Sequence, residues 1–210
     1  MERLLCIAIG YACGLLQTGY LYGKMMHIDI RTKGSGNAGA TNVLRTLGWR
    51  AGLVTFLGDC FKCIFAVMIA KWIFEGNDHV SLFAMYAALG AVLGHNFPFY
   101  LQFKGGKGIA TTAGMIIATM PMLALILTVI FVIVVLLTKY VSLGSIIVAI
   151  LFFVGTLFYG QSGFFGLQGV ALYELYAVAG VLTVLAIVRH RANIKRLLTG
   201  TENKISFHKK

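Results

Sequence analysis

Three basic segments of the sequence, two of them rich in glycine, carry side chains suited to binding phosphate. The first spans residues 31–45 and reads RTKGSGNAGATNVLR. It contains the spacing GxGxxG, formed by Gly34, Gly36 and Gly39. Glycines let backbone N–H groups converge on an anion, and a helix that begins near Asn37 would add its positive end. The segment therefore predicts an anion site beside a helix N-terminus.

Two further features narrow this prediction. The helix after the glycines would carry Thr41 and Arg45 on one face, because they are four residues apart. A dinucleotide-binding fold is excluded, since no strand precedes the glycines and no βαβ unit surrounds them. The alternative to an anion site is an ordinary polar loop followed by a capped helix.

The second segment spans residues 94–111 and reads GHNFPFYLQFKGGKGIAT. Just before a predicted helix it places two lysines among three glycines: Lys104, Gly105, Gly106, Lys107 and Gly108. Lysine is a common point-charge partner of phosphate, and the helix N-terminus adds positive potential. The Walker A pattern GxxxxGK[ST] is not matched. Positive charge that anchors a helix at the membrane would explain the lysines but not the glycines.

The third segment spans residues 189–202 and reads RHRANIKRLLTGTE. One face of the predicted helix carries His190, Asn193 and Leu197. This spacing fits a polar pocket shared with the other two segments. A basic tail that lies on anionic lipid fits the spacing of His190 and Asn193 equally well.

Carboxylates are scarce in and around these segments. Asp29, Asp59 and Glu202 form no close pair, so Mg²⁺-dependent transfer to an alcohol, which needs clustered acids, is disfavoured. We expect no metal, and a site whose cationic and neutral donors stabilise developing negative charge. Within an apolar run, Asp59 and Lys62 are three residues apart. Such residues are functional candidates, but an ion pair that satisfies itself is the alternative.

Composition places these segments in a membrane protein. Of the 210 residues, 59% are apolar without counting the 25 glycines, and 12% are charged, about half the share in soluble domains. A soluble globule, a disordered chain and a disulfide-stapled secreted domain are thereby excluded. The net charge of +11 then indicates anionic lipid or phosphorylated substrates as partners, and no nucleic acid.

We expect one all-α domain over residues 1–210, with seven membrane-spanning helices. They are predicted at residues 4–22, 51–74, 81–101, 109–119, 121–138, 143–159 and 172–188. The fourth is short, because Pro121 interrupts a long apolar run and favours a tight turn. The first lacks a strongly basic start and a small-residue cleavage site, so we interpret it as a retained helix.

Charge predicts how the helices are oriented. All lysines and arginines except Arg3, Lys62 and Lys71 fall in four segments that these spans place on one face. The positive-inside rule therefore puts the N-terminus outside and the C-terminus in the cytoplasm, on the same side as the three basic segments. No internal repeat is evident, so a transporter built from repeats gains no support.

Four stretches of the sequence closely resemble the bacterial membrane acyl-phosphate:glycerol-3-phosphate acyltransferase family. They are SGNAGATNVLR (35–45), GHNFPFYLQFKGGKGIAT (94–111), KYVSLGSI (139–146) and HRANIKRLLTGTENKI (190–205). These stretches are long, occur in the expected order and include segments near both ends of the chain. The resemblance implies a seven-helix enzyme of the bacterial cytoplasmic membrane whose active site faces the cytoplasm.

The resemblance also implies a reaction. A fatty acyl group would pass from acyl phosphate to the 1-hydroxyl of glycerol 3-phosphate, giving lysophosphatidate and phosphate, the first acylation step of phospholipid synthesis. The reaction would use no acyl-CoA, no metal and no cofactor, and the phosphate of the donor would act as its own base. Membrane lipid would surround the enzyme.

The resemblance carries site roles to matching positions. Catalytic roles would fall to Ser35, Arg45, Lys104, His190 and Asn193. Substrate-binding roles would fall to Gly34, Gly36, Asn37, Gly39, Thr41, Asn42, Gly105, Gly106, Lys107, Gly108 and Ser142. Lys104 and the loop after it would hold the phosphate of glycerol 3-phosphate, and Glu202 would be structural. The chain departs from the family at Lys139, where arginine is expected, and at Cys63, where glycine is expected.

Three rival functions remain open. A small anion transporter predicts polar groups near the midplane of several helices, and only the second span clearly has them. A non-catalytic lipid-binding scaffold would need the basic tail but leaves the glycine loops without a role. A different lipid-headgroup transferase would show metal dependence.

Overall fold

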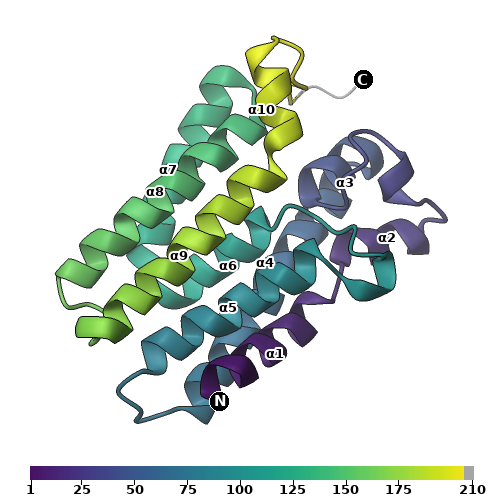
Figure 1. Cartoon of the computed structure of the whole chain (residues 1–210). Coiled ribbons are helices and arrows are strands. Elements are labelled where there is room, and N and C mark those ends of the chain that lie inside the picture. Colours follow the sequence, from purple (N-terminus) through teal and green to yellow (C-terminus); the bar gives the residue numbers. More distant parts are fainter. Residues whose placement is uncertain (206–210) are drawn as a thin grey trace.

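The computed structural model describes residues 1–205, and within them all regular structure is helical (Figure 1). The helices are α1 (Glu2–Gly14), α2 (Thr18–Met25), α3 (Ala40–Leu47), α4 (Trp49–Ile73), α5 (Val80–Asn96), α6 (Ile109–Thr119), α7 (Pro121–Thr138), α8 (Val141–Gln161), α9 (Gly169–Arg189) and α10 (Arg191–Leu198). Two short 3₁₀ helices cover Ile30–Thr32 and Phe99–Leu101.

Among the described residues, six helical segments are long and apolar enough to cross a membrane. They are Glu2–Met25, Trp49–Ile73, Val80–Leu101, Pro121–Thr138, Val141–Gln161 and Gly169–Arg189. A helix rises about 1.5 Å per residue, so 21 residues, as in α8 and α9, reach about 30 Å, the thickness of the hydrocarbon core. The expected seventh span corresponds to α6, which is an apolar helix of 11 residues.

The predicted turn between α6 and α7 is confirmed. Met120 separates the two helices, and Pro121 occupies the first turn of α7, where a missing N–H costs nothing. α6 also packs directly on α4. The two backbones are so close that a Cβ added at Gly114 would lie 2.2 Å from the carbonyl oxygen of Cys60. The short helix is therefore held against a long one by close backbone contact.

The first span is broken, whereas the sequence predicted one helix over residues 4–22. The helix α1 ends at Gly14 and α2 begins at Thr18. The break is stabilised from within the core, because the side-chain amide of Gln17 donates to the carbonyl oxygen of Gly14 at 3.2 Å and the Lys62 ammonium donates to that of Leu16 at 2.7 Å. Carbonyls freed inside an apolar region need such donors.

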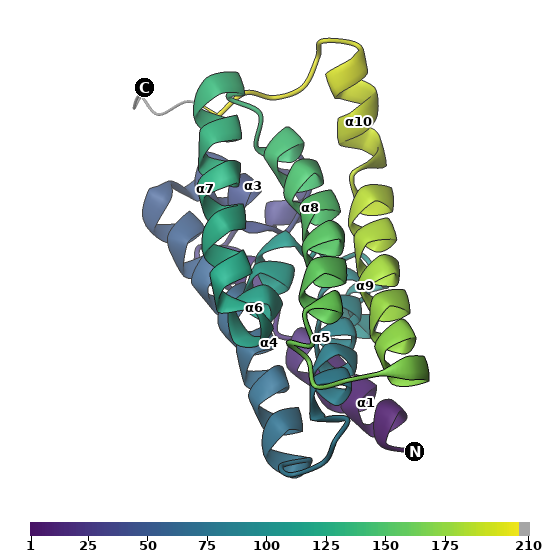
Figure 2. The ribbon, with the colours of Figure 1, turned by 90° about the vertical axis from the view of Figure 1, so that its left-hand side faces the viewer.

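The helix α5 is the most buried of the long helices and packs on α1, α4, α6 and α9. Its contact with α1 is made backbone to backbone, since a Cβ at Gly10 would lie 1.9 Å from the carbonyl oxygen of Ala87 and one at Gly14 would lie 2.2 Å from that of Ala91. Small residues let membrane helices approach this closely. Around this centre, α7, α8 and α9 run side by side in both views (Figures 1 and 2).

The two ends of the described chain lie at opposite ends of the helical bundle (Figures 1 and 2). At the N-terminal end, the Arg3 guanidinium pairs with Glu174, which also accepts a hydrogen bond from the Tyr86 hydroxyl at 2.6 Å. At the other end, α3, α10 and the segments before α6 and α8 come together. The basic segments singled out from the sequence are all gathered at that end.

Candidate active site

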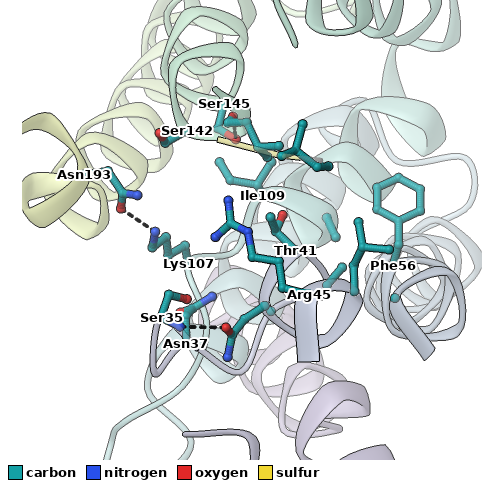
Figure 3. A pocket seen from close by; sticks show the side chains of 18 of the residues that line it. Ser35, Asn37, Thr41, Arg45, Phe56, Lys107, Ile109, Ser142, Ser145 and Asn193 are labelled. Carbon is teal, nitrogen blue, oxygen red and sulfur yellow. Dashed lines mark hydrogen bonds between the residues drawn. The ribbon is translucent and has the colours of Figure 1, made fainter. Parts of the chain in front are cut away.

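A polar pocket of about 440 Å³ lies where these segments meet (Figure 3). It joins residues that are far apart in the sequence. Its polar lining consists of Ser35, Asn37, Thr41, Asn42, Arg45, Asp59, His95, Lys107, Ser142, Ser145, His190, Asn193, Arg196 and Glu202. The structure therefore brings all three basic segments into one site, as the sequence predicted.

The first loop is held in shape by Asn42. Its Nδ2 donates to the carbonyl oxygens of Ile30 at 3.1 Å and Lys33 at 3.0 Å, and its Oδ1 accepts from the backbone N–H of Ser35 at 2.8 Å. At Gly34, φ is +56° and an added Cβ would lie 2.3 Å from Oδ1 of Asn42. Asn42, expected to bind substrate, uses its amide to place Ser35 at the pocket.

The helix expected near Asn37 begins three residues later, at Ala40, with Gly39 in an extended conformation as its N-cap. Asn37 and Gly39 line the pocket, whereas Gly34 and Gly36 are absent from its lining. Residue 36 has φ +73°, so Gly36 supplies a left-handed turn that other residues rarely adopt. Gly34 and Gly36 therefore serve the conformation of this loop, whereas Gly39 lines the pocket.

Thr41 and Arg45 both lie on α3, as predicted, and point into the pocket (Figure 3). The Arg45 side chain extends into its centre, and its Nη2 donates to the backbone carbonyl of Asn203 at 3.1 Å. Burial lowers the pKa of Arg45, and Glu202 opposes that shift. The guanidinium still carries its charge at neutral pH, since arginine does not deprotonate in proteins.

The loop before α6 is packed directly on the end of α5. The N–H of Gly105 donates to the carbonyl oxygen of Asn96 and that of Gly106 donates to the carbonyl oxygen of His95, both at 3.1 Å. These two amides are thereby occupied, although the sequence suggested that they would bind an anion. Arg189 clamps the loop from the other side, and its Nη2 donates to the carbonyl oxygens of Gly105 at 2.9 Å and Gly106 at 2.7 Å.

The two lysines of this loop are placed differently. Lys107 reaches into the pocket and donates a hydrogen bond to Oδ1 of Asn193 (Figure 3). Lys104 is exposed and is absent from the lining of the pocket. Burial lowers the pKa of Lys107 to about 8. Of the two cations assigned to phosphate, the structure brings only Lys107 to the site, with Gly108 lining the pocket behind it.

His190 is the one residue between α9 and α10, and it caps the end of the first helix and the start of the second. Its Nδ1 lies 2.8 Å from the carbonyl oxygen of Ala186. A carbonyl only accepts, so Nδ1 carries the proton and Nε2 is left as an acceptor. Burial, reinforced by the charge of Lys107, lowers the pKa of His190 to about 4, and the imidazole is neutral at pH 7.

Glu202 fastens the last segment of the pocket. Its Oε1 accepts from Nδ2 of Asn193 and its Oε2 accepts from Nε of Arg196, both at 2.9 Å. Since Asn193 also accepts from Lys107, Glu202 orients the asparagine amide: the oxygen faces the lysine and the nitrogen faces the carboxylate. These contacts fit the structural role expected for Glu202.

Ser142 and Ser145 on α8 complete the lining. The Ser145 hydroxyl donates to the carbonyl oxygen of Val141 at 2.9 Å, while the Ser142 Oγ is buried with no hydrogen-bond partner in residues 1–205. Of the two departures from the family pattern, Lys139 caps the end of α7 outside this lining with φ +64°, and Cys63 is fully buried in the core. The change at Cys63 thus affects packing.

Sequence reasoning missed His95, Ser145 and Arg196 as pocket residues, and it left Asp59 between two interpretations. The Asp59–Lys62 ion pair is present, with Nζ 2.9 Å from Oδ1. It is more than a closed pair, however, because the same ammonium lies 2.7 Å from Nδ1 of His95. The signal available in the sequence was the position of His95 between an apolar helix and the glycine loop.

A second cavity of about 160 Å³ adjoins the first between α4, α6, α7, α8 and α9. Phe56, Ile109 and Phe131 line both cavities, so the two lie directly side by side. The second is lined by apolar side chains and three threonines, two of which donate to carbonyls of the helix framework. A ligand with an anionic head and an alkyl chain fits this pair of cavities.

Within residues 1–205, no three His, Cys, Asp or Glu side chains gather as a group that could hold a metal ion. The charged groups that do line the polar pocket are three cations, Arg45, Lys107 and Arg196, and two carboxylates. One carboxylate is paired with Lys62 and the other with Arg196. Arg45 and Lys107 are left to attract an anion.

The chain is similar to known proteins over almost its whole length. Residues 4–200 match the model of a family described as "Glycerol-3-phosphate acyltransferase". A glycerol-3-phosphate acyltransferase from Clostridioides difficile (strain 630) is 45% identical over 208 residues, which cover 98% of this chain and 97% of that protein. One from Thermoanaerobacter sp. (strain X514) is 44% identical over 207 residues, covering 98% and 96%.

Two crystal structures share the fold. Both are of PlsY (YgiH), an integral membrane glycerol 3-phosphate acyltransferase, one in a glycerol 3-phosphate form and one in a lysophosphatidic acid form. The first superposes with a TM-score of 0.84 at 35% identity and covers 98% of this chain and 96% of the other. The similarity therefore extends over nearly the whole chain. This chain is therefore a multi-pass membrane acyltransferase that belongs to the glycerol-3-phosphate acyltransferase family.

Proposed function

We propose that this enzyme transfers a fatty acyl group from acyl phosphate to the 1-hydroxyl of glycerol 3-phosphate, releasing lysophosphatidate and inorganic phosphate. The observation that carries the proposal is the junction of a cationic pocket with an apolar cavity. Acyl phosphate has one anionic end and one alkyl chain and would span the two cavities. Glycerol 3-phosphate has no apolar part and would occupy the polar pocket alone.

Each polar group then has a role in binding. Arg45 and Lys107 neutralise the phosphates, and Arg45 offers the forked donor geometry that matches phosphate oxygens. Ser35 and Ser142 present hydroxyls that donate to a phosphate or orient the attacking hydroxyl. His190 remains neutral and accepts through Nε2, and Asn193 holds Lys107 in place.

The reaction balances without a covalent enzyme intermediate. The 1-hydroxyl oxygen forms a bond to the acyl carbonyl carbon, the bond from that carbon to the phosphate oxygen breaks, and the hydroxyl proton goes to the departing phosphate. Ser35 is assigned an orienting role, because no hydrogen bond in residues 1–205 joins its hydroxyl to a histidine that would activate it as a nucleophile. Holding the two substrates in attack geometry lowers a barrier by about 7–11 kcal/mol.

The same proposal puts the pocket on the cytoplasmic face of a bacterial membrane, with the N-terminus outside and α6 as a short seventh crossing. It is supported by the segments that contain most of the lysines and arginines, which lie at one end of the bundle. Anionic lipid headgroups and the membrane potential favour such charge on the inner side. Membrane lipid then supplies the route by which the acyl chain reaches the second cavity.

The deciding experiment uses purified protein in lipid vesicles, with EDTA present, supplied with glycerol 3-phosphate and either acyl phosphate or acyl-CoA. We expect lysophosphatidate and phosphate from acyl phosphate alone. The variant Ser35→Ala should insert normally but lose activity. Product formed only from acyl-CoA, or only with added metal, would overturn the proposed donor or the metal-free chemistry. Full activity of Ser35→Ala would remove Ser35 from the mechanism.

A further inference from the structure

Three ionisable side chains meet inside the membrane-spanning core, and two of them, Asp59 and His95, also reach the lining of the polar pocket. Lys62 on α4 is 5% exposed, Asp59 one turn before it is 1% exposed, and His95 on α5 is 3% exposed. The lysine ammonium lies 2.9 Å from Oδ1 of Asp59, 2.7 Å from Nδ1 of His95 and 2.7 Å from the carbonyl oxygen of Leu16. An ammonium has three donors, so all three are used.

This arrangement fixes the protonation of the His95 ring. A charged ammonium donates and cannot accept, so Nδ1 of His95 must be the acceptor. A neutral imidazole has one N–H, and it must therefore be on Nε2. The charged ammonium has its counter-ion in Asp59, whose Oδ1 lies 2.9 Å from Nζ. Lys62 thus sets both the position and the tautomer of the ring.

The other end of the His95 ring supports the loop that carries Lys107. A Cβ added at Gly106 would lie 2.1 Å from Nε2 of His95, and one at Gly105 would lie 2.0 Å from the His95 carbonyl oxygen. The backbone N–H of Gly106 also donates to that carbonyl. The loop therefore rests on His95 without a gap, and Lys107 is the next residue along the chain.

The same ammonium reaches the break between α1 and α2, since Leu16 lies in it. Gln17, 1% exposed, ties the break to α5 as well: its side-chain amide donates to the carbonyl oxygens of Gly94 at 3.3 Å and His95 at 3.1 Å. The helix α2 then contacts the first loop, because a Cβ at Gly19 would lie 2.2 Å from the carbonyl oxygen of Ala38. The glycine loop is thus connected to the Lys62 network through His95, and the first loop is connected to it only through α2.

We propose that Lys62 is a positioning residue: its ammonium holds His95 in the Nε2-protonated form beneath the glycine loop and thereby sets where Lys107 enters the pocket. Burying an ion pair costs desolvation, and apolar residues would join the helices at least as well. A role in placing the loop explains why the charges are there. The kinetic part of the inference rests on the proposed function, in which Lys107 binds the phosphate of glycerol 3-phosphate.

The first test needs no activity. ¹⁵N NMR of histidine-labelled protein, with the His95 signals assigned by their loss in His95→Asn, should show an unprotonated Nδ1 and a protonated Nε2. In the charge-free variant Asp59→Leu/Lys62→Met the tautomers should mix. A protonated Nδ1 in the wild type, or an unchanged tautomer in the double variant, would overturn the proposal.

The second test separates positioning from folding by kinetics. The variant Asp59→Leu/Lys62→Met should raise KM for glycerol 3-phosphate by about tenfold or more, while KM for acyl phosphate stays within about twofold. A matched control removes the ion pair at the opposite end of the bundle, Arg3→Met/Glu174→Gln, and should leave both KM values unchanged. Equal loss of both affinities, or a lower melting temperature with unchanged KM, would show that the buried pair is only structural.

A compensating pair guards against a variant that fails to fold. His95→Asn keeps an acceptor for Lys62 but removes the ring end that supports Gly106, and Gly106→Ala places a methyl group where that ring end lay. Each single change should raise KM for glycerol 3-phosphate about tenfold, and the double variant should recover part of that loss. Additive losses would contradict a contact that positions the loop. Lack of any wild-type turnover would instead count against the proposed function and leave the NMR test intact.

Discussion

Lys107 donates a hydrogen bond to the side-chain oxygen of Asn193, and this contact joins the head of α6 to α10 across 86 sequence positions. The lysine is mostly withdrawn from water, yet its partner is an uncharged amide. A buried ammonium with a neutral partner is stabilised further when an anion arrives, because the anion supplies the missing charge. The contact holds Lys107 ready for phosphate and does not compete with it as a carboxylate would.

The two lysines of the glycine loop should differ sharply when each is replaced by methionine. Lys107→Met should lower kcat/KM for glycerol 3-phosphate by about 10- to 100-fold, since a hydrogen bond to a charged group contributes about 1.5–3 kcal/mol. Lys104→Met should change it by less than about threefold, because Lys104 is exposed outside the pocket. Steady-state kinetics in vesicles measures both. A larger loss for Lys104→Met would mean that the loop closes over the substrate.

The pH dependence of kcat/KM should report the lowered pKa of Lys107, about 8. Below that pH the ammonium is charged and attracts phosphate; above it, kcat/KM should fall by up to about tenfold per pH unit. His190, with its pKa near 4, should add no inflection between pH 5 and 7. In the variant Lys107→Arg, kcat/KM should no longer fall at alkaline pH. A fall that persists in that variant would have another origin.

The lowered pKa of Lys107 should make kcat/KM fall at high pH but make the folded protein more stable there. Between about pH 8 and the ordinary lysine value of 10.5, the unfolded chain binds this proton and the folded chain does not, so this group makes the substrate-free protein more stable as pH rises. The comparison is the melting temperature of the wild type minus that of Lys107→Met, from pH 7 to 10. This difference should move in favour of the wild type with rising pH. A flat difference would indicate an unshifted lysine.

Gly106→Ala and Gly180→Ala form a matched pair of glycine substitutions. The first adds a methyl group 2.1 Å from Nε2 of His95 and should displace the loop, reducing activity at least tenfold. The second adds one in the interior of α9, where the nearest heavy atom is 3.6 Å away, and should be active and about 0.5–1 kcal/mol more stable. Activity assays and thermal unfolding test both. Normal activity of Gly106→Ala would mean that the ring moves aside at little cost.

The apolar cavity should govern use of the acyl donor. Ala113 on α6 lines it, and Ala113→Leu would fill part of its volume of about 160 Å³. We expect KM for a long-chain acyl phosphate to rise several-fold, while KM for glycerol 3-phosphate and for a short-chain donor stays constant. Leu125→Phe, at a position 60% exposed on α7, serves as the control of similar added bulk. Equal effects on short and long donors would place the acyl chain elsewhere.

Apolar run lengths and proline placement were enough to predict most of the helices, including the turn at Met120 and Pro121. They failed at residues 15–17, where the break depends on Gln17 and on Lys62, donors that come from the break itself and from another helix. Local hydropathy does not contain that information. A continuous apolar run is compatible with a broken helix wherever the core supplies the missing donors.

At the site, the residue types of the three basic segments predicted a shared pocket, but they did not predict where each side chain lies in it. The three basic segments do meet, and Arg45, Lys107, His190 and Asn193 line one pocket. Lys104 does not, because the left-handed conformations at Gln102 and Phe103 turn the chain before Lys107. Nor could spacing reveal that the amides of the glycine loop are used by α5. Whether these amides bind an anion or a carbonyl depends on which backbone atoms face them, and only the assembled fold determines that.

The residues that line the pocket are spread along almost the whole chain, and this has a consequence for biosynthesis. Ser35 and Arg45 are synthesised early, but Asn193 and Glu202 leave the ribosome only after α9 has been made. A chain translated only as far as α9 lacks Asn193 and has no partner for Lys107 there, so we expect a nascent enzyme to stay inactive until α9 and α10 have been made. Coexpressed fragments divided in the loop between α8 and α9 would accordingly regain activity only by reassembling in the bilayer.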